Sequence, residues 1–253
     1  MKNVCVFFDL DKTILSTSSS MALRKPFVKA GITTRGKNFI GILSQLEYLL
    51  FGANDEKTEK MKERIANLSI GINIKQLEEI TDKSFDKYIY PKCYSHMLDL
   101  IEIHKASHYE TVLASASTEQ IVKPIAKHLN MDHYLGTTLE VEEDEFTGNV
   151  KRFMYSKEKA FAAKKLAEQN NWDLENSYAY SDSITDLPLL ELVGNPVVVN
   201  PDKELERIAI NRNWRIIKTN EKQNLSSQIN KIVYSITLAT ILLTGISLLK
   251  KKK

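Results

Sequence analysis

The order of apolar and polar positions divides the chain into a short first strand, a long helical region, and a region of alternating strands and helices. Residues 4–8, Val-Cys-Val-Phe-Phe, are apolar and β-branched or aromatic, which predicts a strand buried on both faces of a sheet. Residues 19–107 are mostly helical in periodicity, in segments such as 39–52, 54–68 and 74–91. We expect a helical insertion after the first strand.

Strand character returns after this region and alternates with helices. We predict a strand at 109–117, a β ribbon at 137–155 that turns near Thr147-Gly148, a helix at 156–170, and strands at 177–183, 195–200 and 213–217. This alternation indicates an α/β fold around a parallel, Rossmann-like sheet. The helical region is too long for a simple crossover, so we expect a catalytic core at residues 1–16 and 108–218, with a helical cap inserted at 17–107.

The charge balance gives no sign of a nucleic-acid partner. The formal net charge of the 253 residues is +3, but the last four residues are all lysine, and without those four charges it is −1. The apparent basicity therefore belongs to the tail. Cys5 and Cys93 cannot form a disulfide framework and fit a reducing cytosol. No signal peptide is visible, so we expect a cytoplasmic catalytic domain.

Residues 232–249 form an apolar stretch without a charge, after a polar linker at 219–231. As a helix it would be about 27 Å long, close to the hydrocarbon core of about 30 Å, which predicts a segment that attaches the catalytic domain to the inner face of a membrane. Whether it spans the bilayer or lies in the interface stays open, and a buried core helix is the alternative. Small hydroxyl residues on one face leave open a homodimer through paired helices.

Two acids, Asp9 and Asp11, follow the first strand with a single residue between them. Two like charges this close are costly unless a cation or a proton neutralises them, so the pair predicts a divalent metal, a shared proton, or both. A turn with two solvated acids is the alternative. Asp182 and Asp186 end another predicted strand, and strand-end acids can converge on one Mg²⁺ ion.

Two further residues fit phosphate chemistry at the same end of the predicted sheet. Ser115 ends the strand at 109–117, where a hydroxyl with free backbone N–H groups behind it can cradle a phosphate. Lys159 lies near the start of the helix at 156–170, although Lys157 and Lys164 are rivals. Each signal is weak when it is taken alone.

Together these motifs resemble the haloacid dehalogenase superfamily of phosphohydrolases, and most of all the branch that contains the phosphoserine phosphatases. The segment "DLDKT" is similar to the family's D-x-D-x-T motif, "LASAS" to its strand-end serine, and "SDSITD" to its acidic motif, with Lys159 as the lysine. The resemblance covers roughly residues 4–217. It implies a magnesium-dependent phosphatase that acts on a phosphorylated small molecule or lipid.

The resemblance also implies a role for each site residue. Asp9 would be the nucleophile, and Asp11, seated by Thr13, would be the general acid and base. Ser115, the N–H groups from Ala116 onward and Lys159 would hold the phosphate. The metal site would comprise Asp9, the backbone carbonyl of Asp11, and Asp182, with Asp186 in the surrounding shell.

One departure concerns the substrate. Phosphoserine phosphatases carry a glutamate nine residues after the nucleophile that meets the substrate ammonium, and here that residue is Ser18. Phosphoserine therefore looks disfavoured, although a phosphoserine phosphatase stays an alternative. A phosphotransferase with the same motifs and a non-catalytic membrane adaptor are the other two alternatives.

Overall fold

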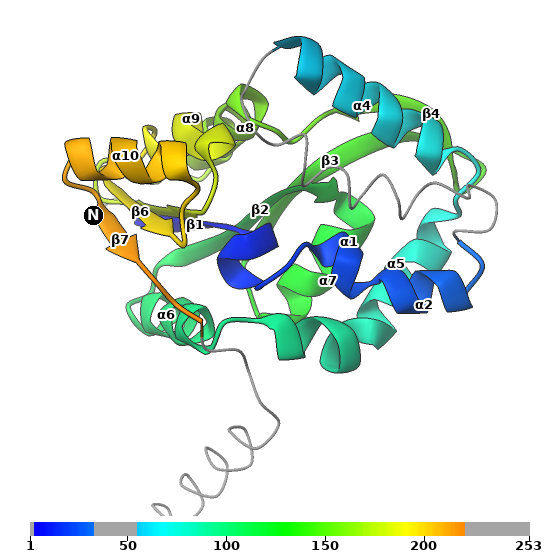
Figure 1. Cartoon of the computed structure of the whole chain (residues 1–253), viewed down its shortest axis with the longest axis horizontal. Coiled ribbons are helices and arrows are strands. Elements are labelled where there is room, and N and C mark those ends of the chain that lie inside the picture. The colour runs from blue at the N-terminus through cyan, green and yellow to red at the C-terminus, as the bar shows by residue number, and fades with distance from the viewer. Residues whose placement is uncertain (1–2, 33–54, 221–253) are drawn as a thin grey trace, which may run out of the picture.

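The computed structural model describes residues 3–32 and 55–220, which fold around a seven-stranded sheet of order β4-β3-β2-β1-β5-β6-β7 (Figure 1). The strands are β1 (Cys5–Asp9), β2 (Glu110–Thr118), β3 (His133–Glu142), β4 (Glu145–Arg152), β5 (Tyr178–Ser181), β6 (Asn195–Val199) and β7 (Arg215–Ile217). Neighbouring strands are parallel except for β3 and β4. The predicted α/β class with a mostly parallel sheet is confirmed.

The helices lie between these strands in the chain. They are α1 (Ser19–Ala22), α2 (Arg24–Lys29), α4 (Asp55–Ser69), α5 (Ile74–Ser84), α6 (Ser95–Ala106), α7 (Glu119–His128), α8 (Lys157–Gln169), α9 (Leu187–Leu190) and α10 (Lys203–Asn211). The helices predicted at 54–68 and 156–170 correspond to α4 and α8. The helix predicted at 39–52 lies outside the described residues.

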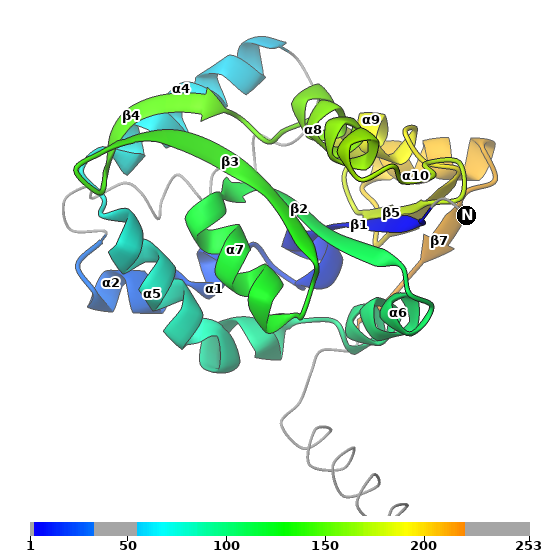
Figure 2. The ribbon, with the colours of Figure 1, turned by 180° about the vertical axis from the view of Figure 1, so that it is seen from behind.

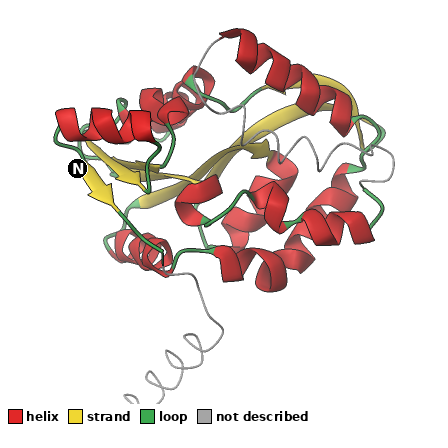
Figure 3. Ribbon diagram, in the orientation of Figure 1, coloured by secondary structure: helices red, strands yellow, loops and turns green. Residues whose placement is uncertain are grey.

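Helices cover both faces of the sheet, which explains why the first strand is apolar on both sides (Figures 2 and 3). Successive side chains of a strand point to opposite faces. Cys5 and Phe7 pack in an apolar cluster with residues of α8, α9 and α10, whereas Val6 and Phe8 pack with residues of α6, α7 and the inserted helices. Burial of each phenylalanine side chain contributes about 2–3 kcal/mol to folding.

The inserted helices are joined to the long β3–β4 hairpin. Helix α4 runs alongside β4 (Figure 1). The backbone N–H of Gly71 donates to the carbonyl of Phe146 at 2.9 Å, and the N–H of Phe146 donates to the carbonyl of Ile72 at 3.1 Å. Helix α6, although it falls in the predicted cap range 17–107, packs against β2. The domain boundaries stay a prediction.

The turn of the β ribbon was predicted near Thr147-Gly148, and this prediction is wrong. The hairpin turns at Glu143 and Asp144, both with positive φ, and Glu142 pairs with Glu145. Gly148 lies within β4 at φ +96°, where a Cβ would be 2.5 Å from the Ile70 side chain. The glycine is therefore required by the close approach of the cap rather than by a turn.

Within residues 3–32 and 55–220, no helix combines the length and the apolar character that crossing a bilayer requires. The apolar segment at 232–249, on which the membrane prediction rests, lies outside the described residues.

Candidate active site

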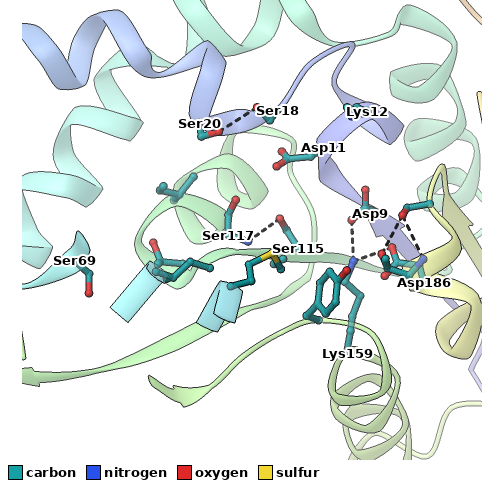
Figure 4. Close-up of a pocket in the computed structure, with 18 of the residues that line it drawn as sticks. Asp9, Asp11, Lys12, Ser18, Ser20, Ser69, Ser115, Ser117, Lys159 and Asp186 are labelled. Carbon is teal, nitrogen blue, oxygen red and sulfur yellow. Dashed lines mark hydrogen bonds and ion pairs between the residues drawn. The ribbon is translucent and has the colours of Figure 1, made fainter. Parts of the chain in front are cut away.

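The predicted site residues meet at the carboxyl ends of three adjacent strands. Asp9 is the last residue of β1, Ser115 lies in β2, and Asp182 directly follows β5. Strand β1 pairs with β2 on one side and with β5 on the other. Ligands of open parallel sheets bind at this edge, and Figure 4 shows Asp9, Ser115, Lys159 and Asp186 around one pocket.

Lys159 connects two of the acids. Its Nζ lies 2.8 Å from Oδ1 of Asp9 and 2.8 Å from Oδ2 of Asp186. The Ser181 hydroxyl donates to the same Asp186 oxygen at 2.7 Å. Lys159 is only 3% exposed, whereas its rival Lys164 lies on the surface near Glu168. The first turn of α8 thus delivers one buried ammonium group into the cluster of acids.

Asp11 is held by the start of α1. Its Oδ1 accepts the backbone N–H of Ser19 at 2.8 Å, and its Oδ2 accepts the Ser19 hydroxyl at 3.3 Å. The hydroxyls of Ser19 and Ser117 are 3.0 Å apart, so β2 supports the same arrangement. Thr13, expected to seat Asp11, instead donates to Oδ1 of Asp182 at 3.2 Å. Ser19 was missed, because one serine in the run "STSSS" carries no distinguishing signal.

Ser115 and Ala116 both line the pocket. The Ser115 hydroxyl is buried and accepts the backbone N–H of Ser117 at 3.2 Å, and the Ala116 carbonyl accepts the Thr137 hydroxyl at 2.7 Å. These bonds fix the end of β2 in a defined conformation beside Asp9. A rigid strand end is suited to holding an anion by its backbone and side-chain donors.

The buried acids are hard to ionise together. Burial raises the pKa of Asp9 to about 7, against the opposing effect of Lys159 and with a further rise from Asp186. Burial and the nearby Asp9 raise the pKa of Asp182 well above its usual range. The pKa of Lys159 is raised as well, because Asp186 and Asp9 outweigh the effect of its burial. The lysine therefore stays charged at neutral pH.

The donor set fits a hard divalent cation. Among the described residues, no three His, Cys, Asp or Glu side chains form a ready-made metal cluster. The expected ligands include only two side chains, Asp9 and Asp182, together with the backbone carbonyl of Asp11. Mg²⁺ is commonly held by one or two carboxylates plus water and substrate phosphate. Asp9 and Asp186 are buried around the single ammonium of Lys159, and Asp182 is half-buried beside them, so a cation would offset the excess negative charge.

The pocket has a volume of about 180 Å³ and extends from these acids to the cap. Away from these acids it is lined by an apolar wall of Ile65, Leu68, Ile72, Leu77, Ile121 and Phe146, whereas Met61 packs beside Tyr155 and Ala116, nearer to the acids. Two more lining residues were missed by the sequence analysis. Tyr155 hydrogen-bonds Thr185 and packs on Met61 of α4, and Asp202 accepts the N–H of Ile184 at 2.7 Å.

Comparisons with known proteins agree with this geometry. A family model described as haloacid dehalogenase-like hydrolase matches residues 6–191. A probable phosphatase of Mycobacterium tuberculosis is 37% identical over 96% of this chain and 84% of its own length. A phosphoserine phosphatase of the same organism is 29% identical over 83% of this chain and 69% of its own.

The fold itself has solved counterparts. The structure of a phosphoserine phosphatase with an analogue of its phospho-aspartyl intermediate has a TM-score of 0.57 at 18% identity, over 91% of this chain and 99% of that chain. This likeness shows a shared fold. With the family match and the phosphatase relatives, it leads to one conclusion: the chain belongs to the haloacid dehalogenase-like hydrolases and is a phosphomonoester hydrolase of that family.

Proposed function

We propose that this phosphatase works through an aspartyl-phosphate intermediate formed on Asp9. The observation that carries the proposal is the buried contact of Lys159 with both Asp9 and Asp186, beside an Asp11 that is held by Ser19. One carboxylate is thus placed beside a fixed positive charge. The other is oriented separately, as the division between nucleophile and proton carrier requires.

The proposed reaction has two steps, in which Asp9 first gains and then loses the phosphoryl group. A carboxylate oxygen of Asp9 attacks phosphorus, the ester P–O bond breaks, and the leaving alkoxide takes the proton of Asp11. Water then attacks the phosphorus of the aspartyl phosphate and gives a proton to Asp11. The acyl-phosphate P–O bond breaks, and inorganic phosphate and the Asp9 carboxylate are released. Lys159, Ser115 and the N–H groups that follow Ser115 neutralise the phosphoryl oxygens in both steps.

The proposed cofactor is Mg²⁺, held by Asp9, Asp182 and the carbonyl of Asp11, with Asp186 holding Lys159. When bound, the cation would screen the repulsion between carboxylate and phosphate. Support comes from the excess of buried negative charge at the site and from the family.

Trapping the intermediate tests this proposal. Protein mixed with ³²P-labelled p-nitrophenyl phosphate and Mg²⁺, then quenched in acid, should carry label that hydroxylamine removes. Asp9→Asn should carry none, whereas the exposed control Asp86→Asn should label like the unmodified protein. Label that survives in Asp9→Asn would exclude Asp9 as the nucleophile. A labelled alcohol product in the presence of an added acceptor would instead favour the phosphotransferase.

Phosphoserine is a poor substrate in this proposal. Ser18 caps α1 and its hydroxyl lies 3.0 Å from that of Ser20. Two neutral hydroxyls therefore occupy the place where the ammonium of phosphoserine would need a carboxylate. One mycobacterial relative is named a phosphoserine phosphatase, which supports the alternative that phosphoserine is the substrate. Comparison of kcat/KM for phosphoserine and for neutral phosphomonoesters decides between them.

We also propose membrane attachment through residues 232–249, on the sequence alone. The full chain should sediment with membranes and resist high-salt extraction, because apolar burial does not depend on charge. A chain ending at Asn220 should remain in solution and keep its activity. Crosslinking of the full chain in membranes tests the homodimer.

A further inference from the structure

Charge is confined to one end of the pocket. Among the described residues that line it, the charged side chains are Asp9, Asp11, Lys12, Lys159, Asp182, Asp186 and Asp202. All seven lie in the strand ends, loops and helix start at the edge of the sheet. The proposed binding of phosphate and a metal ion explains why the charged side chains gather at this end.

The other end is the apolar wall, which is built from five segments. Helix α4 contributes Ile65 and Leu68, the hairpin contributes Phe146, and α5 contributes Leu77. Phe146 is 2% exposed and Leu77 is 1% exposed, so these side chains are fixed by packing rather than free to turn away. Between the two ends stand the neutral hydroxyls of Ser18, Ser20 and Ser117 (Figure 4).

This arrangement discriminates between leaving groups. The phosphate must bind beside Asp9, so the leaving group extends from there, and the apolar wall bounds the pocket opposite the charged edge. An ammonium or carboxylate that reached the wall would lose its hydration without meeting an opposite charge among the described lining residues, which is costly. A methylene at the same place leaves water for an apolar surface, which is favourable.

Resting on the proposed function, we infer that the substrates are phosphomonoesters of neutral alcohols with an apolar body, and that amino-acid and amino-alcohol phosphates are rejected at the cap end. Two kinds of substrate carry such an apolar body: the phosphate of a soluble aliphatic or aromatic alcohol, and a lysolipid phosphate with its acyl chain. The wall recognises the chemistry that these share.

A homologous series tests the inference on the unmodified protein. With Mg²⁺, kcat/KM should rise about three- to fourfold per methylene from ethyl to hexyl phosphate. Phosphoserine and phosphoethanolamine should fall at least about 100-fold below hexyl phosphate, because their charges stay unpaired. A plateau after hexyl phosphate indicates a soluble alcohol, and a further rise through dodecyl phosphate and lysophosphatidate, below their micelle concentrations, indicates a lipid.

A charge placed in the wall should reverse the preference. Ile65 of α4 is only partly buried, so Ile65→Glu adds a carboxylate at the wall at moderate structural cost. This variant should lower kcat/KM for hexyl phosphate about 30-fold or more and raise it for phosphoethanolamine. The matched control is Ile103→Glu on α6, a site that is 58% exposed and outside the pocket, and it should change neither value.

Acetyl phosphate distinguishes failure of the proposed function from failure of the inference about the leaving group, because its acetyl group offers little apolar surface to the wall. If acetyl phosphate is not hydrolysed, or Asp9→Asn hydrolyses it equally well, the proposed function itself fails. If it is hydrolysed but the alkyl series is flat, or phosphoserine exceeds hexyl phosphate, the inference about the leaving group is overturned and the function stands.

Discussion

At the core end of the pocket, Asp9 and Asp186 meet the ammonium of Lys159, and Asp182 directly follows the neighbouring strand β5. The cap end is an apolar wall from five separate segments. The core end comes from short motifs in the sequence, because each side chain sits at a fixed place relative to a strand end. The cap end has no motif, since its members are related only by packing. One end therefore sets the reaction, and the other sets which alcohol leaves.

The largest expected effect is on the core end. Asp9→Asn removes the proposed nucleophile, so kcat/KM should fall at least about 1,000-fold for acetyl phosphate and hexyl phosphate alike. Steady-state assays with both substrates measure this, with Asp86→Asn as the surface control. A loss confined to one substrate would contradict the division of labour between the two ends.

The second largest loss of activity is expected for Lys159, which bridges Asp9 and Asp186. Lys159→Ala leaves Asp9 and Asp186 buried without their shared positive charge, and activity should fall about 100-fold or more with both substrates. Lys157→Ala, an exposed lysine two residues earlier on the same helix, should remain fully active. Equal activity of the two variants would mean that the contact with Asp9 is structural only.

The third prediction concerns pH and metal. The pKa of Asp9 in the folded protein, about 7, lies above its ordinary value of 3.8, so the proton is bound more tightly by the folded state. Without metal, this group's contribution to stability should therefore decrease as the pH rises from about 4 to 7. Mg²⁺ needs the ionised carboxylate, so its affinity should fall about tenfold per pH unit below 7. The rise in Tm on adding Mg²⁺ should be smaller at pH 6 than at pH 8, and an equal rise at both would refute this.

A smaller effect is expected for Ser19, which holds Asp11, the proposed proton carrier. Ser19→Ala removes the hydroxyl that lies 3.3 Å from Asp11 but keeps the backbone N–H at 2.8 Å. We expect a loss of about two- to fivefold in kcat, because Asp11 loses only one weak hydrogen bond. Ser18→Ala, whose hydroxyl contacts Met21 and Ser20 rather than Asp11, is the control. Equal losses in both variants would show that the effect is not specific to Asp11.

The smallest effect is on the cap end and depends on the substrate. Leu68→Ala shortens one member of the apolar wall, so kcat/KM for hexyl phosphate should fall about threefold while acetyl phosphate is unaffected. Ile70→Ala, two residues later and 55% exposed, should leave both unchanged. Parallel losses on the two substrates would indicate that the cap acts on the reaction itself.

The sequence predicted which residues lie together at the core end because its signals are local. Asp9 ends an apolar run, and Lys159 falls two residues into a helix, so each position follows from the element beside it. Asp202 could not be found in this way, because it reaches the site through its contact with Ile184, eighteen residues earlier. The hairpin turn was misplaced for a related reason. Gly148 looked like a turn residue, but its conformation is set by Ile70 of the cap, a contact that no local pattern records.

The place of β1 at the centre of the sheet has a consequence for biosynthesis. Its partners are β2, about one hundred residues later, and β5, whose Tyr178 pairs with Val6 across a separation of 172 residues. At about 5–20 residues per second, the first strand emerges from the ribosome roughly 10–35 s before its second partner has been synthesised. During that interval the Val-Phe-Phe run lacks its partner on at least one side. The nascent chain is therefore expected to be a client of ribosome-associated chaperones, and to complete the centre of its sheet only after β5 has emerged.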